Sequence, residues 1–328
     1  MAVYKIFPEK TTTLFSSNPL QNTGLDEIIE VSADDNNISR ALIQFDTTEL
    51  SEVISKTSGS YDSYLKIYLA NNSLAPTDYT LSFNSLSRSW DMGNGKLNDK
   101  TISSKGANWN YSDAANQLPW VGGEFSTSIA STQRFQYKDN KDIEVNINPI
   151  VAGWLTSNNG LIIKQNDESL DVNLKYFSGN THTIYPPCLE IRWDDSVYQS
   201  TAVPIINSNV VLTLSNNKKT YQQNSVQKFR INVRDRFPAR KFQSYSVYLD
   251  NKILPATSWW SIKDLDTEET IVDFDPINTK ISADNVGNYF KVFMNGLQPE
   301  RYYKFLFKYE IDGEEIISDD SYYFKVVR

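Results

Sequence analysis

The chain has 328 residues, a length that suits about two ordinary domains. Its formal net charge of −8 argues against nucleic-acid partners, because proteins that bind nucleic acids carry basic patches. One cysteine and one histidine exclude an internal disulfide and supply too few ligands for a structural zinc site. The first residues lack the apolar core of a secretory signal, and no apolar run is long enough to span a membrane.

In the first half of the chain, apolar and polar residues alternate with period two between turns rich in Gly, Pro and Asn, which predicts β-strands. The expected strands are 5–7, 12–15, 27–31, 41–45, 63–69, 80–87, 143–147, 161–164, 171–176 and 189–193. Because the strands share one apolar face, we predict a single β-sandwich over residues 1–195. Five apolar side chains are expected to be buried together in its core: Phe45, Leu65, Ile67, Ile162 and Ile191.

Almost no helix is expected. Residues 148–154 have helical character, and Pro149 suits the first turn of a helix. Residues 47–49, Thr-Thr-Glu, follow the strand at 41–45 and are expected to form an acidic turn.

A long aromatic and Gly-rich insertion lies between Asn84 and Phe125, and a loop of this length in a compact domain is usually functional or packs on itself. Its candidate contact residues are Trp90, Trp109, Tyr111 and Trp120. Two interpretations are open. The tryptophans form a platform on which sugar rings stack, or the insertion packs on itself and covers one sheet.

The segment 194–209 lacks apolar periodicity and is expected to join the two halves, with residues 196–204 as the linker and 205–328 as a second β-sandwich. The strands expected there are 210–214, 228–234, 244–249, 258–263, 270–274, 289–294, 302–309, 315–318 and 322–327. Asp312-Gly313 is a strong signal for a hairpin turn between two of them.

Gly296-Leu-Gln-Pro-Glu-Arg-Tyr-Tyr303 resembles the Gly-Leu-x-Pro-x-x-x-Tyr corner of fibronectin type III sandwiches, where an inward Leu and a Tyr hydroxyl hold the turn between two strands. The core residues expected in this half are Leu297, Tyr302, Phe305 and Phe324. A local basic stretch in this acidic chain is either a solvated face or a docking patch for an acidic neighbour. It consists of Arg230, Arg234, Arg236, Arg240 and Lys241.

Catalytic and metal-binding patterns have little support. His182 lies in a turn, and no Gly-x-Ser-x-Gly elbow or nucleotide-binding glycine motif occurs. The Asx-rich turns 34–37, 139–142 and 264–266 lack the spacing of a calcium-binding EF-hand loop and are common between strands. We therefore expect no enzyme activity, no cofactor and no bound metal, with Cys188 buried in a strand.

Several segments of the first half resemble the DNRLRE-type β-sandwich domain. They are Asn22-Thr-Gly24, the run from Ser39 to Asp46, Gly160-Leu-Ile-Ile163, Tyr176-Phe-Ser178 and Pro187-Cys-Leu-Glu-Ile191. The chain departs from the family at Thr11-Thr-Thr13, where the family usually has Asp. This resemblance, which covers residues 1–195, and that of the corner at 296–303 together imply an all-β chain of two tandem antiparallel β-sandwiches, the first DNRLRE- or jelly-roll-like and the second fibronectin III- or Ig-like. This family occurs as a non-catalytic module on extracellular and surface proteins.

Short runs in the second half, and residues 4–10, resemble structural proteins of tailed bacteriophages. In the second half they are 258–269, 279–282, 287–290 and 323–328. This resemblance implies a non-enzymatic virion protein of the head, neck or tail, made in the host cytoplasm without a signal peptide. Its partners would be other virion proteins and further copies of itself, with no nucleic acid and no insertion into a membrane. The alternative is a carbohydrate-binding surface module that contacts host glycan through the aromatic loop.

Overall fold

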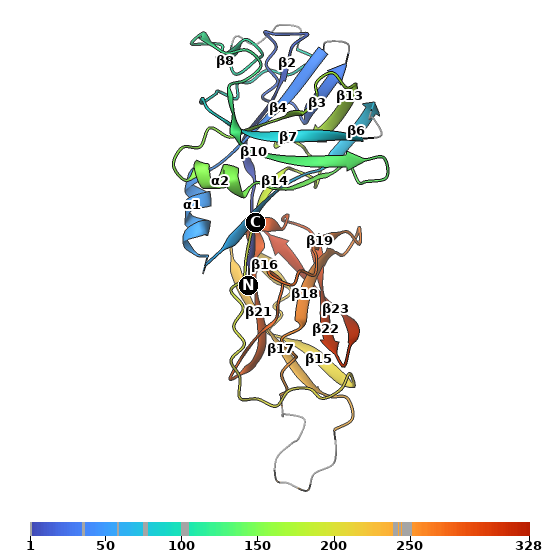
Figure 1. Cartoon of the computed structure of the whole chain (residues 1–328). Coiled ribbons are helices and arrows are strands. Elements are labelled where there is room, and N and C mark those ends of the chain that lie inside the picture. Colours follow the sequence, from blue (N-terminus) through green and yellow to red (C-terminus); the bar gives the residue numbers. More distant parts are fainter. Residues whose placement is uncertain are drawn as a thin grey trace. The chain divides into compact units, whose positions relative to one another are not determined.

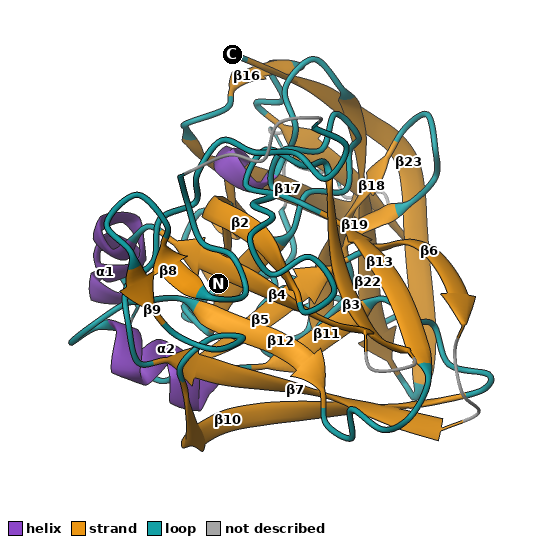
Figure 2. Cartoon of the chain, turned by 90° about the horizontal axis from the view of Figure 1, so that it is seen from above, coloured by secondary structure: helices purple, strands orange, loops and turns teal. Residues whose placement is uncertain are grey.

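The computed structural model describes residues 2–34, 37–57, 59–74, 78–99, 105–238, 242, 244 and 251–328. Within them β-strands dominate and helices are short, so the chain is all-β as the sequence predicts (Figures 1 and 2). The chain divides into two compact units. The N-terminal unit is Lys5–Lys56 with Asp62–Ile191, and the C-terminal unit is Met1–Tyr4, Thr57–Tyr61 and Arg192–Arg328.

The N-terminal unit is built around an eight-stranded sheet of order β10-β7-β12-β4-β3-β13-β6, with β2 also paired to β4. Its strands are β2 (Pro8–Phe15), β3 (Ile28–Asp34), β4 (Asn37–Phe45), β6 (Leu69–Leu74), β7 (Asp78–Leu86), β10 (Phe125–Gln136), β12 (Leu161–Gln165) and β13 (Val172–Phe177). A four-stranded sheet has the order β1-β14-β5-β11. Its strands are β1 (Ala2–Ile6), β5 (Tyr61–Ile67), β11 (Ile143–Asn146) and β14 (Cys188–Trp193).

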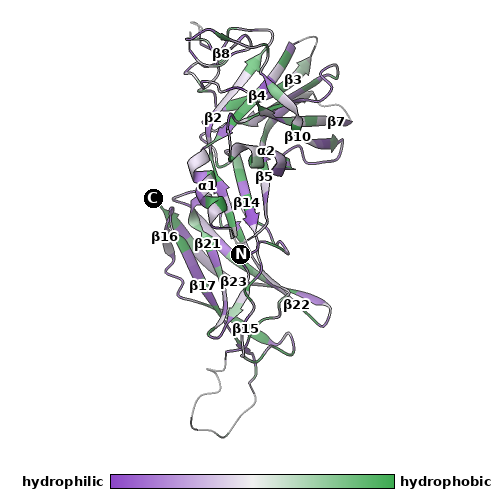
Figure 3. Ribbon diagram, turned by 60° about the vertical axis from the view of Figure 1, so that its left-hand side comes forward, coloured by the Kyte–Doolittle hydropathy of each residue, from purple (hydrophilic) through white to green (hydrophobic). Residues whose placement is uncertain are grey.

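Both faces of the eight-stranded sheet are covered in part by apolar packing. All five predicted core residues of this half are fully buried. However, Ile162 lies opposite Leu42 in the ladder, on the face of the sheet opposite to that of Phe45. The prediction that all five share one core is therefore wrong for Ile162, which belongs to a second, smaller apolar cluster. Hydrophobic and hydrophilic residues alternate along the strands (Figure 3).

The prediction of almost no helix missed α1 (Thr47–Ser55), which replaces the expected acidic turn. The Asp46 side chain accepts a hydrogen bond from the Thr48 backbone N–H at 2.9 Å and caps the helix, while Leu50 and Val53 are buried one turn apart. The helical segment expected near Pro149 is present as α2 (Asn148–Trp154). Among the described helices, none is long and apolar enough to cross a membrane.

The C-terminal unit holds a four-stranded sheet of order β15-β17-β21-β20 and a five-stranded sheet of order β16-β23-β22-β18-β19. The strands are β15 (Val210–Ser215), β16 (Thr220–Gln222), β17 (Val226–Asp235), β18 (Ser258–Asp264), β19 (Thr270–Val272), β20 (Ser282–Asp284), β21 (Gly287–Phe293), β22 (Tyr302–Ile311) and β23 (Glu314–Val327). The pairings are antiparallel except that β16 runs parallel to β23. The strand expected at 244–249 lies outside the described residues apart from position 244.

The hairpin between β22 and β23 turns at Asp312-Gly313, as predicted. Both residues have positive φ, 53° and 80°, which matches the type I′ geometry that joins twisted strands tightly. The two strands expected at 315–318 and 322–327 are one continuous strand, β23. A register shift opposite Phe305 and Phe307, with φ of 55° at Ser321, marks the point where we expected a break.

The corner motif before β22 forms as the sequence predicts. Leu297 follows a short 3₁₀ turn, η2 (Met294–Gly296), and is buried, and the buried Tyr303 hydroxyl donates to the Gln298 carbonyl at 3.0 Å. Phe305 and Phe324 are also buried, as expected. The assignment of Tyr302 to the core is wrong, since its side chain is 43% exposed and its neighbour Tyr303 points inward instead.

Replacing Tyr303 with phenylalanine is expected to lower the free energy of unfolding by about 1 kcal/mol, because the Gln298 carbonyl loses its donor while the ring still packs. Chemical denaturation of the purified protein measures the change. Tyr302→Phe is the matched control and should unfold like the parent, because the Tyr302 side chain lies outside the core. Equal losses in the two variants would contradict the role assigned to the corner.

Candidate functional site

The insertion between β7 and β10, described over residues 87–99 and 105–124, covers part of the eight-stranded sheet. Trp90, Ala107 and Trp120 from the insertion pack on four apolar side chains of the strands. These are Leu14, Leu42, Leu86 and Ile162. The insertion is thus held on the sheet by a small apolar core of its own, which supports the self-packing interpretation over the sugar-stacking one.

The indole rings of the insertion do not form an exposed platform. Trp90 and Trp120 are each only 4% exposed, and their ring N–H groups donate to the carbonyls of Asn159 at 2.9 Å and Asn108 at 2.7 Å. The prediction of a partner or glycan contact at Trp90 and Trp120 is therefore wrong, because the bulky rings are needed to fill the space between loop and sheet.

Trp109 and Tyr111 are half-buried. The Arg40 guanidinium lies 5.0 Å from the Trp109 ring centroid, a cation–π contact that covers one side of the indole. Arg40 also forms a two-pronged ion pair with Glu168, at 2.7 and 2.8 Å, and donates to the Gly122 carbonyl at 2.7 Å. Arg40 therefore fixes the insertion to the sheet beside Trp109.

A buried asparagine near the start of the chain, Asn22, fixes the backbone of the insertion through hydrogen bonds. The Asn22 amide group donates to the carbonyls of Met92 and Ala107 at 2.9 and 2.8 Å. Its side-chain oxygen accepts from the backbone N–H groups of Gly24 and Gly95 at 3.3 and 2.8 Å. The side chain is fully buried and its hydrogen-bonding capacity is used completely. Sequence reasoning noticed Asn22-Thr-Gly24 as a motif but not this function.

The outer surface of the insertion carries exposed aliphatic side chains. Val121 is 77% exposed and Leu118, on the short hairpin of β8 (Tyr111–Asp113) and β9 (Leu118–Pro119), is 45% exposed. Leu20 is 49% exposed, and its carbonyl accepts a hydrogen bond from the Asn108 side chain. We call Leu20, Leu118 and Val121 the apolar rim.

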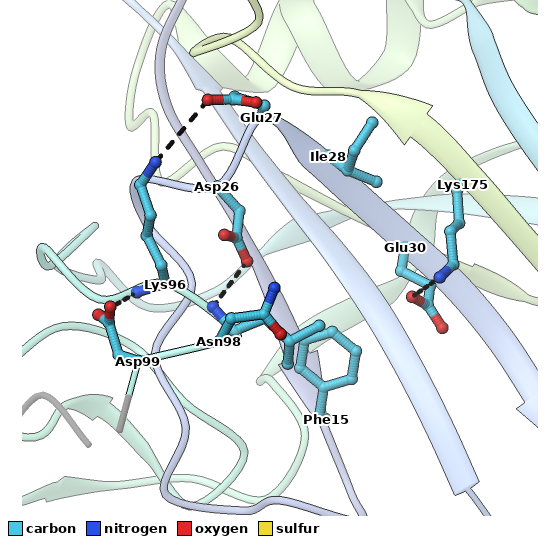
Figure 4. Close-up of a pocket in the computed structure, with 10 residues that line it drawn as sticks. Phe15, Asp26, Glu27, Ile28, Glu30, Lys96, Asn98, Asp99 and Lys175 are labelled. Atoms are coloured by element: carbon cyan, nitrogen blue, oxygen red, sulfur yellow. Dashed lines mark hydrogen bonds and ion pairs between the residues drawn. The ribbon is translucent and has the colours of Figure 1, made fainter. Parts of the chain in front are cut away.

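A cavity of about 390 Å³ lies between β3, β13 and the turn 96–99 of the insertion (Figure 4). It is lined by Phe15, Asp26, Glu27, Ile28, Glu30, Lys96, Leu97, Asn98, Asp99 and Lys175. Ile28 and Glu30 alternate along β3 with buried residues, and Lys175 of β13 lies opposite Glu30 in the ladder. The turn 96–99 of the insertion forms the facing wall.

Charged groups of both signs line this cavity. The Lys96 and Lys175 ammonium groups lie 3.8 Å from Glu27 and 3.6 Å from Glu30. Asp26 accepts from the Leu97 backbone N–H at 3.1 Å, and Asp99 accepts from the Lys96 backbone N–H at 2.8 Å. The lining thus contains four carboxylates and two ammonium groups and is acidic. It offers both donors and acceptors of hydrogen bonds.

The carboxyl group of Asp26 is the one most affected by this environment. Burial raises its pKa, and the nearby carboxylates of Asp99 and Glu27 add to the rise. The Leu97 N–H and the Lys96 ammonium act in the opposite direction and offset only part of it. The negative charge of Asp26 is therefore only partly compensated by its neighbours.

The predicted basic stretch of the C-terminal unit is in part neutralised. Arg230 forms a two-pronged pair with Asp284, both contacts at 2.9 Å, and Lys228 approaches the same carboxylate at 3.3 Å. The hydrogen bonds from Arg230 hold the pKa of Asp284 well below its usual range. Arg234 is half-buried and donates to the carbonyl of Asp235, and Arg236 is exposed. The remaining two predicted residues, Arg240 and Lys241, lie outside the described residues.

The histidine, the cysteine and the Asx-rich turns considered as candidate sites are exposed, buried or bonded within the fold. His182 is 88% exposed in its turn and lies 3.6 Å from Glu27, and Cys188 is buried, both as expected. In the Asx-rich turns, Asp142 accepts from the Leu69 N–H and Asp264 pairs with Arg301. Over the part of the chain that the structure describes, no cluster of three or more metal-binding side chains occurs.

No protein-family model and no curated protein sequence matches the chain. Among solved structures, a DUF4785 family protein from Legionella pneumophila is similar over 99% of this chain, with 9% sequence identity and a TM-score of 0.20. The chain spans 62% of the length of that protein.

Proposed function

We propose that the protein is a non-enzymatic structural component of a bacteriophage virion that acts through protein–protein contacts. The apolar rim carries this proposal. Val121 is largely exposed, yet the residues on both sides of it are fixed, since the Trp120 N–H bonds to the Asn110 carbonyl at 2.9 Å and the Gly122 N–H to the Trp109 carbonyl at 2.8 Å. Exposed aliphatic groups on a preorganised loop lose little conformational freedom on binding, which favours a contact surface.

Arg234 and Arg236 supply a second candidate contact, on the C-terminal unit. No ion pair of either side chain occurs in the described part of the chain, whereas Arg230 is already paired with Asp284. Their charge suits the acidic surface of a further copy of this chain or of another virion protein. The proposal thus combines an apolar and an electrostatic contact, on separate units.

The alternative function, glycan binding through the aromatic loop, has less support. It requires open indole faces, but Trp90 and Trp120 are buried and Trp109 is covered on one side by Arg40. Trp109→Ala would separate the two functions, because the alternative predicts loss of saccharide binding without loss of incorporation into particles.

Incorporation into purified particles tests the proposal. The parent chain should be found by mass spectrometry among the proteins of the particle, and Val121→Asp should reduce its amount about tenfold or more, because a charge would be buried without a partner. Ile317→Asp is the matched control, since Ile317 is also exposed but lies on β23 of the C-terminal unit. Absence of the parent chain from particles would refute the virion function, and an unchanged Val121→Asp would refute the contact.

A further inference from the structure

We propose that the cavity between β3, β13 and the turn 96–99 binds a short saccharide that is neutral or carries an amine. This site is independent of the virion contact proposed above, because none of its lining residues belongs to the apolar rim. It also differs from a glycan site on the tryptophans of the insertion, since none of the three is part of its lining.

The size and the lining of the cavity suit such a ligand. A volume of about 390 Å³ lies within the range of pockets that hold small molecules. Phe15 and Ile28, which Figure 4 labels, and Leu97 of the same lining provide apolar contact for the C–H face of a sugar ring. The lysines and Asn98 offer hydrogen-bond donors, and the carboxylates offer acceptors, so that hydroxyl groups can be bound in both directions.

The charge of the lining selects among saccharides. Asp26, Glu27, Glu30 and Asp99 outnumber Lys96 and Lys175 by two charges when all are ionised. A positively charged amine near Asp26 would balance the negative charge of this carboxylate, which its neighbours in the protein balance only in part. A uronic acid would instead bring a further negative charge into an acidic cavity. We therefore expect neutral and amine-bearing sugars to bind and acidic ones to be rejected.

The position of Asp26 makes a substitution there informative. Its carboxylate faces the cavity and is held by the Leu97 N–H, an interaction that an asparagine oxygen can reproduce. Asp26→Asn therefore removes the charge and keeps the shape of the wall. Because a hydrogen bond to a charged group is stronger than one between neutral groups, the variant should lose affinity for an amine more than for a hydroxyl.

Saturation-transfer NMR and calorimetry on the full chain, with three disaccharides as probes, test the proposal. Cellobiose and the disaccharide of glucosamine should bind, and digalacturonate should bind at least about tenfold more weakly. Asp26→Asn should weaken binding of the glucosamine disaccharide about tenfold or more and that of cellobiose much less. Asp171→Asn is the matched control, because it removes an exposed carboxylate outside the cavity and should leave binding of all probes unchanged.

Two outcomes would overturn the inference. One is that no probe shows saturation transfer from the parent chain at millimolar concentration. The other is that Asp26→Asn, with an unchanged melting curve, binds all three probes like the parent. Neither outcome affects the virion proposal, which depends on incorporation of the Val121→Asp variant into particles.

Discussion

Replacing Asn22 by alanine is expected to lower the free energy of unfolding of the N-terminal unit by at least about 3 kcal/mol, because four backbone groups, three of them in buried contacts, lose their partner at once. Each such group costs about 1–3 kcal/mol when it is left unsatisfied away from water. The loss exceeds that of a typical side-chain hydrogen bond, since the Asn22 side chain is fully buried and makes four hydrogen bonds.

Urea denaturation followed by tryptophan fluorescence measures this change directly. Trp90 and Trp120 belong to the insertion and are buried against the sheet, so their emission should shift to longer wavelength when the insertion leaves the sheet. Asn116→Ala is the control, because Asn116 is an exposed residue of the same insertion whose side chain bonds to the nearby Asp113. If the two variants unfold at the same urea concentration, the insertion is not held by Asn22.

Close packing around Asn22 explains why glycines surround it. A Cβ atom built on Gly93 would lie 2.5 Å from the Asn22 side-chain oxygen, and one on Gly106 would lie 2.4 Å from the Gly93 Cα. Both residues also have positive φ, 73° and 85°. The Gly-rich composition of the insertion is thus a requirement of this buried contact, and in the sequence it resembled only a flexible loop.

The strands that the sequence predicts best have one apolar face. In β5 and β13 buried and half-buried residues alternate along the strand, and both strands were expected close to their observed bounds. The strand β10 was missed because its residues 126–134 are mostly Ser, Thr and Gln and none of them is buried. Period-two alternation is a burial signal, so an edge strand that is polar on both faces does not show it.

Two other errors come from local features that permit more than one conformation. Asp46 and Glu49 have the spacing of a capping box, but an acidic turn and the first turn of a helix share that composition. Tyr302 and Tyr303 are adjacent and chemically identical, and only the strand register decides which of them faces the core.

The candidate site was less predictable than the fold because its parts are distant in sequence. The cavity combines Phe15, residues 26–28, Glu30, the turn 96–99 and Lys175. Asn22 binds carbonyl groups 70 and 85 residues away. Neither the periodicity of apolar residues nor a short motif predicts contacts between residues so far apart in the sequence. The sequence does show the tryptophans of the insertion. Their burial, however, depends on apolar side chains of strands that are distant in the sequence and lie next to one another only in the folded sheet.

Replacing Asp264 by alanine is expected to lower the free energy of unfolding of the C-terminal unit by about 2–4 kcal/mol. The Asp264 side chain is 1% exposed, contacts the Arg301 Nε at 2.6 Å and accepts the backbone N–H groups of Asp266 and Thr267, both at 3.0 Å. Arg301 is 24% exposed and can regain water. The cost should therefore lie toward the lower part of the range for broken buried ion pairs.

The same pair makes the stability of this unit depend on pH. Burial of Asp264 acts to raise its pKa, but the Arg301 guanidinium and the two backbone N–H groups outweigh that effect and leave the pKa lowered. A carboxyl group whose pKa is lower in the folded state stabilises the fold above its unfolded pKa, and this stability is lost as the pH falls through the folded pKa. The difference between parent and Asp264→Ala should therefore be largest at neutral pH and shrink below about pH 4.

Urea denaturation of both proteins across this pH range measures the difference. Asp266→Ala is the control, because Asp266 lies in the same turn but its side chain is exposed, and its unfolding curve should follow that of the parent at each pH. A difference between parent and Asp264→Ala that stays constant with pH would mean that Asp264 acts through its shape and not through its charge. Dependence of the difference on pH separates the ion pair from the packing, because only the ion pair is removed by protonation.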